Sequence, residues 1–390
     1  MKKQSRRSFI ESAIKSAVAL PLIISGLYSC DASPKENKEE KEDVESKKLS
    51  ILILGGTSFL GPHQIAYALE RGHSVTTFTR GKTKPTVHQE LFDQIEQLIG
   101  DRQDDLTALH DRQWDVVIDN SGRDVEWTKA TAQLLKDSCD LYVYTSSTGV
   151  YYPYIDSDFK EDSAVLMEEP EGLTDEDEKI EYWYGVMKAN SEQEAIKAFG
   201  AENTIIVRPT YMFGPADKTD RFIHWPIRLS KGGEVLVPGK ANDAIQYADV
   251  RDVAEWMIRL IEERNTGTFN AVGPKEAQNM RAFIEEAKDA FDAESSFVYI
   301  DDYDFLKEND VYYIVPWIMP TGNNAGSAKI NNDKAKANGF SVRPLTETVK
   351  DTYDWWNSDA ISQEKRDEVE QNPESILQRE EAIIAAWKAK

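Results

Sequence analysis

The stretch that most constrains the fold runs from residue 49 to 61 and reads Leu-Ser-Ile-Leu-Ile-Leu-Gly-Gly-Thr-Ser-Phe-Leu-Gly. An unbroken apolar run that ends in glycines predicts a strand buried on both faces. The segment 62–71 then has its apolar residues at helical spacing. A turn between such a strand and helix directs unpaired backbone N–H groups and the positive end of the helix to one place, which suits a pyrophosphate.

The glycines of this turn have distinct predicted uses. Gly55 permits the tight turn, and Gly61 permits close approach of the helix to the strand. The alternative is an ordinary strand-to-helix turn that binds nothing, because glycine-rich loops occur without ligands. The strand before the turn and the helix after it favour a nucleotide. The predicted cofactor-binding residues of the turn are Gly55, Thr57, Ser58, Phe59, Leu60 and Gly61.

Strands and helices alternate through the following segments, which predicts an α/β fold with a doubly wound parallel (Rossmann) sheet. A change of pattern after residue 273 predicts a smaller C-terminal α+β substrate lobe. The predicted strands are 73–79, 96–99, 114–119, 141–145, 204–208 and 268–272, and the predicted helices among them are 126–138, 179–199 and 249–263. Beyond 273 we expect helices at 280–291, 346–356 and 375–387 and a strand at 297–300.

These patterns divide the chain into four parts. Residues 1–30 form an export or lipoprotein signal, and residues 31–48, nearly all charged or polar, form a disordered tether. Residues 49–272 form a dinucleotide-binding domain with a substrate-lobe insertion around 212–245. Residues 273–390 form the C-terminal substrate lobe and helices.

The N-terminus has the composition of a targeting segment. The sequence Ser-Arg-Arg-Ser-Phe-Ile at 5–10 resembles a twin-arginine export signal, and 17–28 is apolar but short for a permanent membrane span. The sequence Leu-Tyr-Ser-Cys at 27–30 resembles a lipoprotein cleavage box, which implies acylation of Cys30. We therefore expect an exported, lipid-anchored protein of the bacterial periplasm or cell envelope. The alternative is a cytoplasmic protein with a basic and apolar tail.

The charge balance restricts the partners. The chain has 69 acidic and 46 basic residues, a formal net charge of −23. An excess of negative charge opposes nucleic acid and anionic membranes as main partners, so membrane contact is expected only through the lipid anchor. No metal site is predicted, because the acidic segment 156–177 lacks EF-hand spacing and favours a solvated flap. With two cysteines, one of them Cys30, no disulfide framework is expected, and Cys139 should pack as a small buried residue.

The ends of the predicted strands carry further cofactor candidates. An acidic residue after the second strand would bind the ribose hydroxyls of NAD, whereas a nearby arginine accommodates the 2′-phosphate of NADP. The chain has Thr-Arg-Gly-Lys at 79–82, so Arg80 favours NADP over NAD, unless this is only an exposed basic turn. Asp101 follows the third strand and could meet the adenine. Asn120 and Ser121 follow the fourth strand, where a cofactor would pass.

Three side chains suggest proton-transfer chemistry. Tyr184 and Lys188 are four residues apart and share one face of the predicted helix. A phenol ordinarily has a pKa of about 10, and a nearby ammonium favours its ionised form. Ser147, after the fifth strand, could hold a substrate oxygen while Tyr184 moves the proton. Such acid–base help contributes about 10²–10⁴-fold.

Together these motifs resemble an extended short-chain dehydrogenase/reductase of the NAD-dependent epimerase/dehydratase type, over about residues 49–263. The resemblance implies that Ser147, Tyr184 and Lys188 are catalytic, that Tyr184 and Lys188 also contact the cofactor, and that Pro209 passes the nicotinamide. One departure is Ser58 in place of the family's middle glycine, as in a divergent branch that reads Gly-Gly-Thr-x-Phe-x-Gly. That branch includes reductase-like proteins and plastid RNA-associated proteins that lack the intact trio.

The expected function is therefore an NAD(P)-dependent oxidoreductase or epimerase, acting by hydride transfer on a hydroxyl or carbonyl of a small, sugar-like molecule. Thr148, Tyr211 and Arg221 are the predicted substrate-binding residues, whereas His224 is expected to pack. The apolar segment 311–320 is expected to pack rather than to line the cleft. The alternatives are a non-catalytic NAD(P)-binding sensor or scaffold and an RNA-associated protein. The oligomeric state is open, with a homodimer among the alternatives.

Overall fold

The apolar runs of the N-terminal two thirds form one parallel sheet. Its strands are β1 (Ser50–Leu54), β2 (Ser74–Thr79), β3 (Glu96–Ile99), β4 (Val116–Asp119), β5 (Leu141–Thr145), β6 (Thr204–Pro209) and β10 (Gly267–Ala271). The structure, a computed structural model, describes residues 47–120 and 122–390, and these contain a seven-stranded sheet in the order β10-β6-β5-β4-β1-β2-β3. All its strand pairs are parallel, which confirms the predicted fold class.

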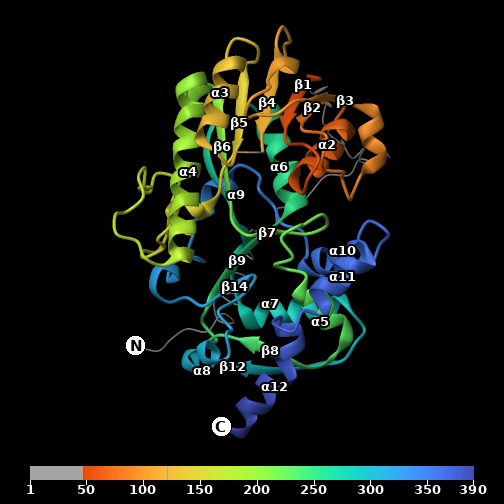
Figure 1. Cartoon of the computed structure of the whole chain (residues 1–390), viewed down its shortest axis with the longest axis vertical. Helices are drawn as coiled ribbons and strands as arrows, with labels where there is room; N and C mark the ends of the chain where they lie inside the picture. The colour runs from red at the N-terminus through yellow and green to blue at the C-terminus, as the bar shows by residue number, and fades with distance from the viewer. Residues whose placement is uncertain (1–46, 121) are drawn as a thin grey trace, which may run out of the picture. The chain divides into compact units, whose positions relative to one another are not determined.

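Helices cover both faces of this sheet (Figure 1). They are α2 (Leu60–Glu70) packed with α6 (Val250–Glu262) and α3 (Val125–Leu135) packed with α4 (Glu176–Phe199). Successive residues of β1 serve opposite faces, because Ile51 and Ile53 join the core of α2 and α6 while Leu52 and Leu54 join that of α3 and α4. All four are fully buried, so the strand reads as a continuous apolar run.

The strand order reverses between β1 and β4. From β1 the sheet continues through β2 and β3 on one side and through β4, β5, β6 and β10 on the other. In open α/β sheets such a reversal leaves a crevice at the carboxyl ends of the strands, where ligands bind. Gly55 follows β1 and Asn120 follows β4, so both lie at that edge.

The remaining elements build a second hydrophobic core, around Trp225, Phe283 and Trp317. β7, β9 and β11 form a three-stranded sheet, and β8 pairs in parallel with β12 (Figure 1). The elements are β7 (Met212–Phe213), α5 (His224–Lys231), β8 (Gly233–Pro238), β9 (Ala244–Asp249), β11 (Gly273–Asn279), α7 (Met280–Ala287), β12 (Ser295–Ile300), α8 (Tyr303–Glu308), β13 (Tyr313–Ile314), β14 (Trp317–Ile318), α9 (Asp333–Ala337), α10 (Leu345–Trp356), α11 (Gln363–Glu370) and α12 (Ile376–Ala389). Short 3₁₀ helices are η1 (Gln89–Gln94), η2 (Thr107–Leu109), η3 (Thr148–Tyr151), η4 (Ala201–Asn203), η5 (Lys288–Ala290) and η6 (Gly322–Asn324).

A buried charge cluster ties α6 to α10. Asp249 caps α6 by accepting from the Arg251 backbone N–H at 2.8 Å, and its side chain also accepts from the Thr348 hydroxyl at 2.7 Å. Arg343 donates to Asp252 at 2.7 Å. Although burial raises the pKa of Asp249, its bonds to arginines outweigh this and hold that pKa below its ordinary value. These contacts join the dinucleotide-binding half to the C-terminal elements.

Several local expectations need correction. The acidic residues at 175–177 do not belong to a loop, because Asp175 caps α4 and the helix begins at Glu176. Carboxylates are stabilised at a helix N-terminus by its unpaired N–H groups and dipole, which the flap interpretation overlooked. The strands β8, β9 and β11 were also not expected. Cys139 is buried as expected, and burial raises the pKa of its thiol to about 12.

Three N-terminal expectations lie outside the described residues. They are the export signal of residues 1–30, the acylation of Cys30, and nearly all of the tether 31–48. In the described part of the chain no helix is long and apolar enough to cross a membrane.

Candidate active site

The glycine-rich turn after β1 is fixed by close backbone contacts. Gly55 has φ +84°, which favours glycine, and its N–H donates to the Phe78 carbonyl at 3.1 Å. A Cβ on Gly61 would lie 2.4 Å from the Gly56 carbonyl oxygen. The close approach therefore joins the start of α2 to the turn itself, whereas the sequence suggested an approach to the strand.

Helix α2 begins without a capping side chain among the described residues. The Gly61 N–H donates to the Ser58 carbonyl at 3.2 Å and Pro62 has no N–H, so the Leu60 N–H is the donor that remains among the first three helical residues. Phe59 precedes the helix with φ +48°, a conformation that costs a non-glycine residue about 1–3 kcal/mol. Phe59, the residue that carries this strain, lines a cavity that Tyr184 also lines. The turn and the phenol thus share one space.

A glycine pair brings the two predicted catalytic segments together. A Cβ on Gly185 of α4 would lie 2.5 Å from the Gly149 carbonyl oxygen, and a Cβ on Gly149 would lie 3.0 Å from the Tyr184 ring and 3.3 Å from Ser147 Oγ. Only glycines allow α4 to pack this closely on η3. The contact places the Tyr184 ring beside the Ser147 hydroxyl, although the two residues are 37 positions apart in sequence.

The hydroxyl of Ser147 is oriented by its own turn. Its Oγ accepts a hydrogen bond from the Gly149 N–H at 3.0 Å, because Ser147 caps η3. A hydroxyl that accepts one bond retains its proton, so Ser147 can donate to an oxygen in the cavity.

Lys188 is held one turn behind Tyr184. Its Nζ donates to the Thr145 carbonyl at 2.9 Å and lies 4.9 Å from the centre of the Tyr144 ring. Burial disfavours the ammonium, but the phenols of Tyr144 and Tyr184 outweigh that effect and hold the pKa of Lys188 above its ordinary value. Lys188 is therefore a buried cation next to the predicted acid–base residue.

A buried network of hydrogen bonds lies next to Ser147 and involves Arg208, Glu192, Tyr151 and Ser146. Arg208 donates two hydrogen bonds to Glu192, at 2.9 and 2.7 Å, and a third to the Tyr151 hydroxyl at 2.7 Å. Glu192 also accepts from the hydroxyl of Ser146, the neighbour of Ser147. The network was not predicted from the sequence. The signal that could have revealed it is Arg208, a charged residue near the end of an otherwise apolar strand.

The predicted residues converge on an inner cavity of about 330 Å³ at the carboxyl edge of the sheet. Residues from the turn, η3, α4 and the segment after β6 line it. The predicted residues among its lining are Phe59, Ser147, Thr148, Tyr184, Pro209, Tyr211 and Arg221. Lys188 is not part of the lining, and it contacts the cavity wall through Thr145 and Tyr184.

Other predicted cofactor residues do not line this cavity. Arg80 is exposed directly after β2 and has no ion-pair partner among the described residues. Asp101 accepts from the Gln103 N–H at 3.2 Å and so caps its own loop. Asn120 bridges Gln64 and Thr145, at 2.6 and 2.7 Å. Ser121 lies outside the described residues.

A buried ion pair near these residues was not anticipated. Arg102 donates to Asp119 at 2.8 Å, and Asp119 also accepts from the Tyr142 hydroxyl at 2.7 Å. The pair lies between the end of β4 and α3, where Arg102 also bonds the Trp127 carbonyl at 2.9 Å. The side chain that turns inward after β3 is therefore Arg102, and the neighbouring Asp101 serves its own loop.

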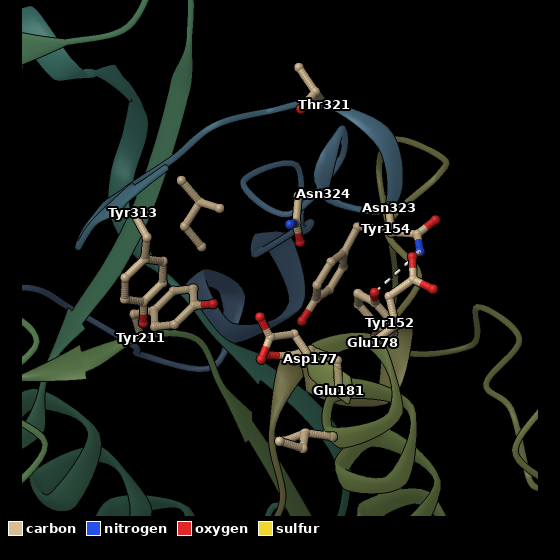
Figure 2. Close-up of a pocket in the computed structure, with 12 residues that line it drawn as sticks. Tyr152, Tyr154, Asp177, Glu178, Glu181, Tyr211, Tyr313, Thr321, Asn323 and Asn324 are labelled. Atoms are coloured by element: carbon tan, nitrogen blue, oxygen red, sulfur yellow. Dashed lines mark hydrogen bonds between the residues drawn. The ribbon is translucent and has the colours of Figure 1, made fainter. Parts of the chain in front are cut away.

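An outer cavity of about 450 Å³ adjoins the inner one. Figure 2 shows Tyr154, Asp177 and Glu181 between the Tyr211–Tyr313 pair on one side and Tyr152 with Asn323 on the other. The expectation for 311–320 was partly wrong, because Val311 and Trp317 pack in the core while Tyr313 lines both cavities. Its position in a short hairpin could not be read from apolar content alone.

His224 lies outside both cavities. Its ring packs edge-on against Trp225, and burial lowers its pKa to about 3. This agrees with the expected packing role. Among the described residues no group of His, Cys, Asp and Glu is arranged to hold a metal ion.

Comparison with known proteins identifies the family. The sequence profile of the NAD dependent epimerase/dehydratase family matches residues 51–272, more than half of the chain. The chain belongs to this family. Its matched region comprises the whole parallel sheet and both predicted catalytic segments. Membership in the NAD dependent epimerase/dehydratase family supports an enzyme that uses NAD(P).

A curated relative is named for stem-loop binding rather than for an epimerase or dehydratase. The chloroplast stem-loop binding protein of 41 kDa b of Arabidopsis thaliana is 29% identical over 248 residues, which are 59% of this chain. The match spans 60% of that relative's own length, less than two thirds.

Solved structures share the fold at low identity. UDP-glucuronic acid 4-epimerase from Bacillus cereus in complex with NAD is 18% identical, with a TM-score of 0.52 over 78% of this chain and 98% of that one. The dTDP-glucose 4,6-dehydratase from Bacillus anthracis in complex with NAD is 14% identical, with a TM-score of 0.57 over 80% and 98%. At these identities the likeness extends to the fold.

The residues present fit a dinucleotide. The turn has backbone in place of side chains where Gly55 and Gly61 lie, since a Cβ on Gly61 would collide with Gly56. The uncapped start of α2 offers the Leu60 N–H and the positive end of the helix dipole to a diphosphate, and Tyr184 and Pro209 line the inner cavity together with Phe59 of the turn. Ser58 occupies the position of the middle glycine.

Proposed function

We propose that this protein is an NAD(P)-dependent oxidoreductase or epimerase that acts on a hydroxyl or carbonyl of a small, sugar-like molecule. The observation that carries the proposal is the common inner cavity, which Phe59 of the glycine-rich turn lines together with Ser147 and Tyr184. A nucleotide bound at the turn would therefore present its reactive end beside a hydroxyl and a phenol.

Each residue of the trio has a defined task in the proposed reaction. Ser147 donates a hydrogen bond to the substrate oxygen, and Tyr184 removes or returns the proton at that oxygen. Lys188, charged and buried behind Tyr184, stabilises negative charge on the phenol oxygen. The bound dinucleotide would accept or supply the hydride at the adjacent carbon. The residues that follow Ser147 in sequence, Thr148 and Gly149, supply neither the further acid nor the further base that a dehydration needs.

A substitution of Tyr184 separates an enzyme from a sensor. Tyr184→Phe removes the proton-transfer group and keeps the ring that packs on Gly149, so turnover should fall about 10²–10⁴-fold while dinucleotide affinity stays within a few-fold. The measurements are steady-state rates and fluorescence titration with NADH and NADPH. If the variant kept the full function of the parent protein, the result would favour the non-catalytic sensor or scaffold.

We further propose a preference for NADP, supported by Arg80, which is exposed after β2 with no acidic residue beside it in sequence. The dinucleotide released from the purified full chain on denaturation should be NADP(H). Arg80→Glu should weaken NADPH binding more than NADH binding, with Lys82→Glu as a neighbouring control. Recovery of NAD(H) alone would refute the preference, and recovery of no dinucleotide together with no binding would refute the proposed function.

The curated relative supports testing RNA as a partner, because its name describes stem-loop binding. We propose that RNA is not the main partner here, since the net charge of −23 opposes phosphate binding. A structured RNA stem-loop titrated at physiological salt should bind no more tightly than heparin does. Submicromolar, structure-dependent affinity would instead favour the RNA-associated alternative.

We also propose that the protein is exported and lipid-anchored, on the basis of the sequence at 5–10 and of Cys30. Arg6→Lys together with Arg7→Lys should retain the protein in the cytoplasm. Cys30→Ala should abolish labelling by a radioactive fatty acid while leaving the folded enzyme active.

A further inference from the structure

The two cavities form a continuous space. Five residues line both of them: Tyr154, Ile180, Glu181, Tyr211 and Tyr313. A substrate whose reacting carbon lies beside Ser147 and Tyr184 therefore extends naturally into the outer cavity. The lining of the outer cavity decides what the remainder of that substrate can be.

The outer cavity is acidic. Its lining includes Asp177, Glu178 and Glu181 and contains no lysine, arginine or histidine. Glu178 accepts a hydrogen bond from the Asn323 amide at 2.9 Å, whereas neither Asp177 nor Glu181 has a hydrogen-bonded or ion-paired side-chain partner among the described residues. Burial raises the pKa of Glu181, as expected for a carboxylate without an adjacent charge-assisted bond.

The combined lining of the two cavities contains, among the described residues, a single cation, Arg221. Its guanidinium lies 5.3 Å from the centre of the Tyr211 ring, and its Nε donates to Thr219 at 2.9 Å. The lining thus has one arginine against three carboxylates. A diphosphate carries at least two negative charges, so its binding in the outer cavity would place it among like charges.

The remaining polar groups of the outer cavity are uncharged donors and acceptors. Burial raises the pKa of Tyr152, Tyr154 and Tyr211, so these phenols stay protonated at neutral pH. Asn323 and Asn324 add two amides. Phenols, amides and carboxylates together offer many hydrogen bonds to hydroxyl groups, and the tyrosine rings offer apolar faces.

Some of the exposed apolar side chains belong to the cavity lining itself. They are Ile180 and Tyr313, which line both cavities, and Trp183, which lines the inner one. Exposed apolar surface at the mouth of a cavity is typical of a binding surface.

We propose that the outer cavity binds a sugar unit of a glycan that carries no nucleoside diphosphate. This inference rests on the proposed function, because it assigns the part of the substrate that lies beyond the reacting carbon. Sugar rings present hydroxyl edges to carboxylates and amides and C–H faces to tyrosine rings, without negative charge. The acidic lining thereby selects against nucleotide sugars and in favour of unphosphorylated saccharides.

The test measures saccharide binding independently of turnover. Isothermal titration of the purified full chain compares cello-, malto- and chito-oligosaccharides with UDP-glucose and UDP-glucuronic acid, each with and without saturating NADPH. We expect at least one unphosphorylated oligosaccharide to bind tenfold or more tightly than either UDP-sugar. Tighter binding of a UDP-sugar than of every oligosaccharide would overturn the inference, as would the absence of oligosaccharide binding at millimolar concentration.

A charge variant tests the cause. Glu181→Lys should weaken oligosaccharide binding at least fivefold and strengthen UDP-sugar binding, whereas Glu176→Gln, outside the cavity on the same helix, should change neither. Unchanged selectivity in Glu181→Lys, with its circular dichroism spectrum preserved, would refute the electrostatic argument. Dinucleotide binding without oligosaccharide binding leaves the proposed function standing and refutes only the glycan. Oligosaccharide binding without dinucleotide binding would support the saccharide site and refute the proposed function.

Discussion

The two adjoining cavities are built in different ways. Around the inner one, buried contacts fix the groups that do the chemistry, such as Gly149 against Gly185, and Lys188 is held behind the wall on the Thr145 carbonyl. The lining of the outer one includes exposed side chains, among them Tyr313, which is 42% exposed and lines both cavities. The comparison teaches that the chemistry is positioned by the packed edge of the sheet, while substrate selection is left to surface segments.

The charged side chains of the two regions differ in burial. Beneath the inner cavity, Glu192 and Arg208 satisfy each other, and both are nearly inaccessible to solvent. In the outer cavity Asp177 and Glu181 are exposed, and neither has a partner side chain among the described residues. Paired buried charges make a site rigid, whereas unpaired carboxylates are available to a ligand. Substitutions in the two regions should therefore affect different measurements.

The largest expected effect concerns the ion pair beneath the inner cavity. Arg208→Met leaves Glu192 buried without its partner and should destabilise the protein by about 3–5 kcal/mol. Chemical denaturation measures the change. The control is Lys197→Met, which removes an exposed pair with Glu194 and should cost about 0–1 kcal/mol. If the two variants lost the same free energy of unfolding, the expected difference between the buried and the exposed ion pair would be contradicted.

The glycine contact between α4 and η3 should affect both stability and rate. Gly185→Ala places a Cβ 2.5 Å from the Gly149 carbonyl oxygen, so the helix must move away. We expect a loss of about 1–3 kcal/mol and a fall in kcat of more than tenfold, because Tyr184 moves with the helix. Gln193→Ala, exposed on the same helix, should change neither quantity. An unchanged kcat would show that the site tolerates a looser α4 than the geometry requires.

A buried histidine of α2, His63, predicts that the stability of the protein depends on pH. His63 bonds the Pro215 carbonyl at 3.0 Å and faces His88, Asp249 and Arg251, and burial lowers its pKa to about 4. The unfolded chain takes up a proton near pH 6.5, before the folded protein does. The contribution of His63 to the free energy of unfolding is complete above pH 6.5 and declines as the pH falls toward 4.

The expected loss from His63 is up to about 2 kcal/mol between pH 6.5 and 5, at about 1.4 kcal/mol per unit. Denaturation midpoints measured across this range should fall less steeply in His63→Gln than in the parent protein. The exposed His110→Gln serves as the control. Parallel pH profiles for all three proteins would contradict the assignment of this slope to His63.

The smallest effect on stability should come from the outer cavity. Tyr313→Ala removes a partly exposed ring that pairs with Tyr211 at 6.0 Å, so stability should change by only about 0.5 kcal/mol. KM for the substrate should rise about tenfold while kcat changes less than twofold, because the ring contributes binding surface and no proton-transfer group. A fall in kcat without a change in KM would show that the ring positions the reacting groups rather than binding the substrate.

Local pattern was sufficient to predict the inner site in large part. The apolar run before Gly55, the position of Ser147 after a strand, and the four-residue spacing of Tyr184 and Lys188 each reflect a local rule. Those rules concern strand burial, turn geometry and helix periodicity, which act over a few residues. The structure brings Phe59, Ser147 and Tyr184 to one cavity because parallel strands end at the same edge of the sheet.

The sequence by itself determined the α/β class, the direction of the strands and seven of the residues that line the inner cavity. Only the tertiary structure decided that Tyr154, Glu181 and Tyr313 form one wall, that Arg102 rather than Asp101 turns inward, and that Glu192 pairs with Arg208. The physical reason is the distance along the sequence over which each kind of interaction acts. Periodicity and turn chemistry are encoded in neighbouring residues, whereas a cavity wall or a buried ion pair depends on segments that meet only after the chain has folded.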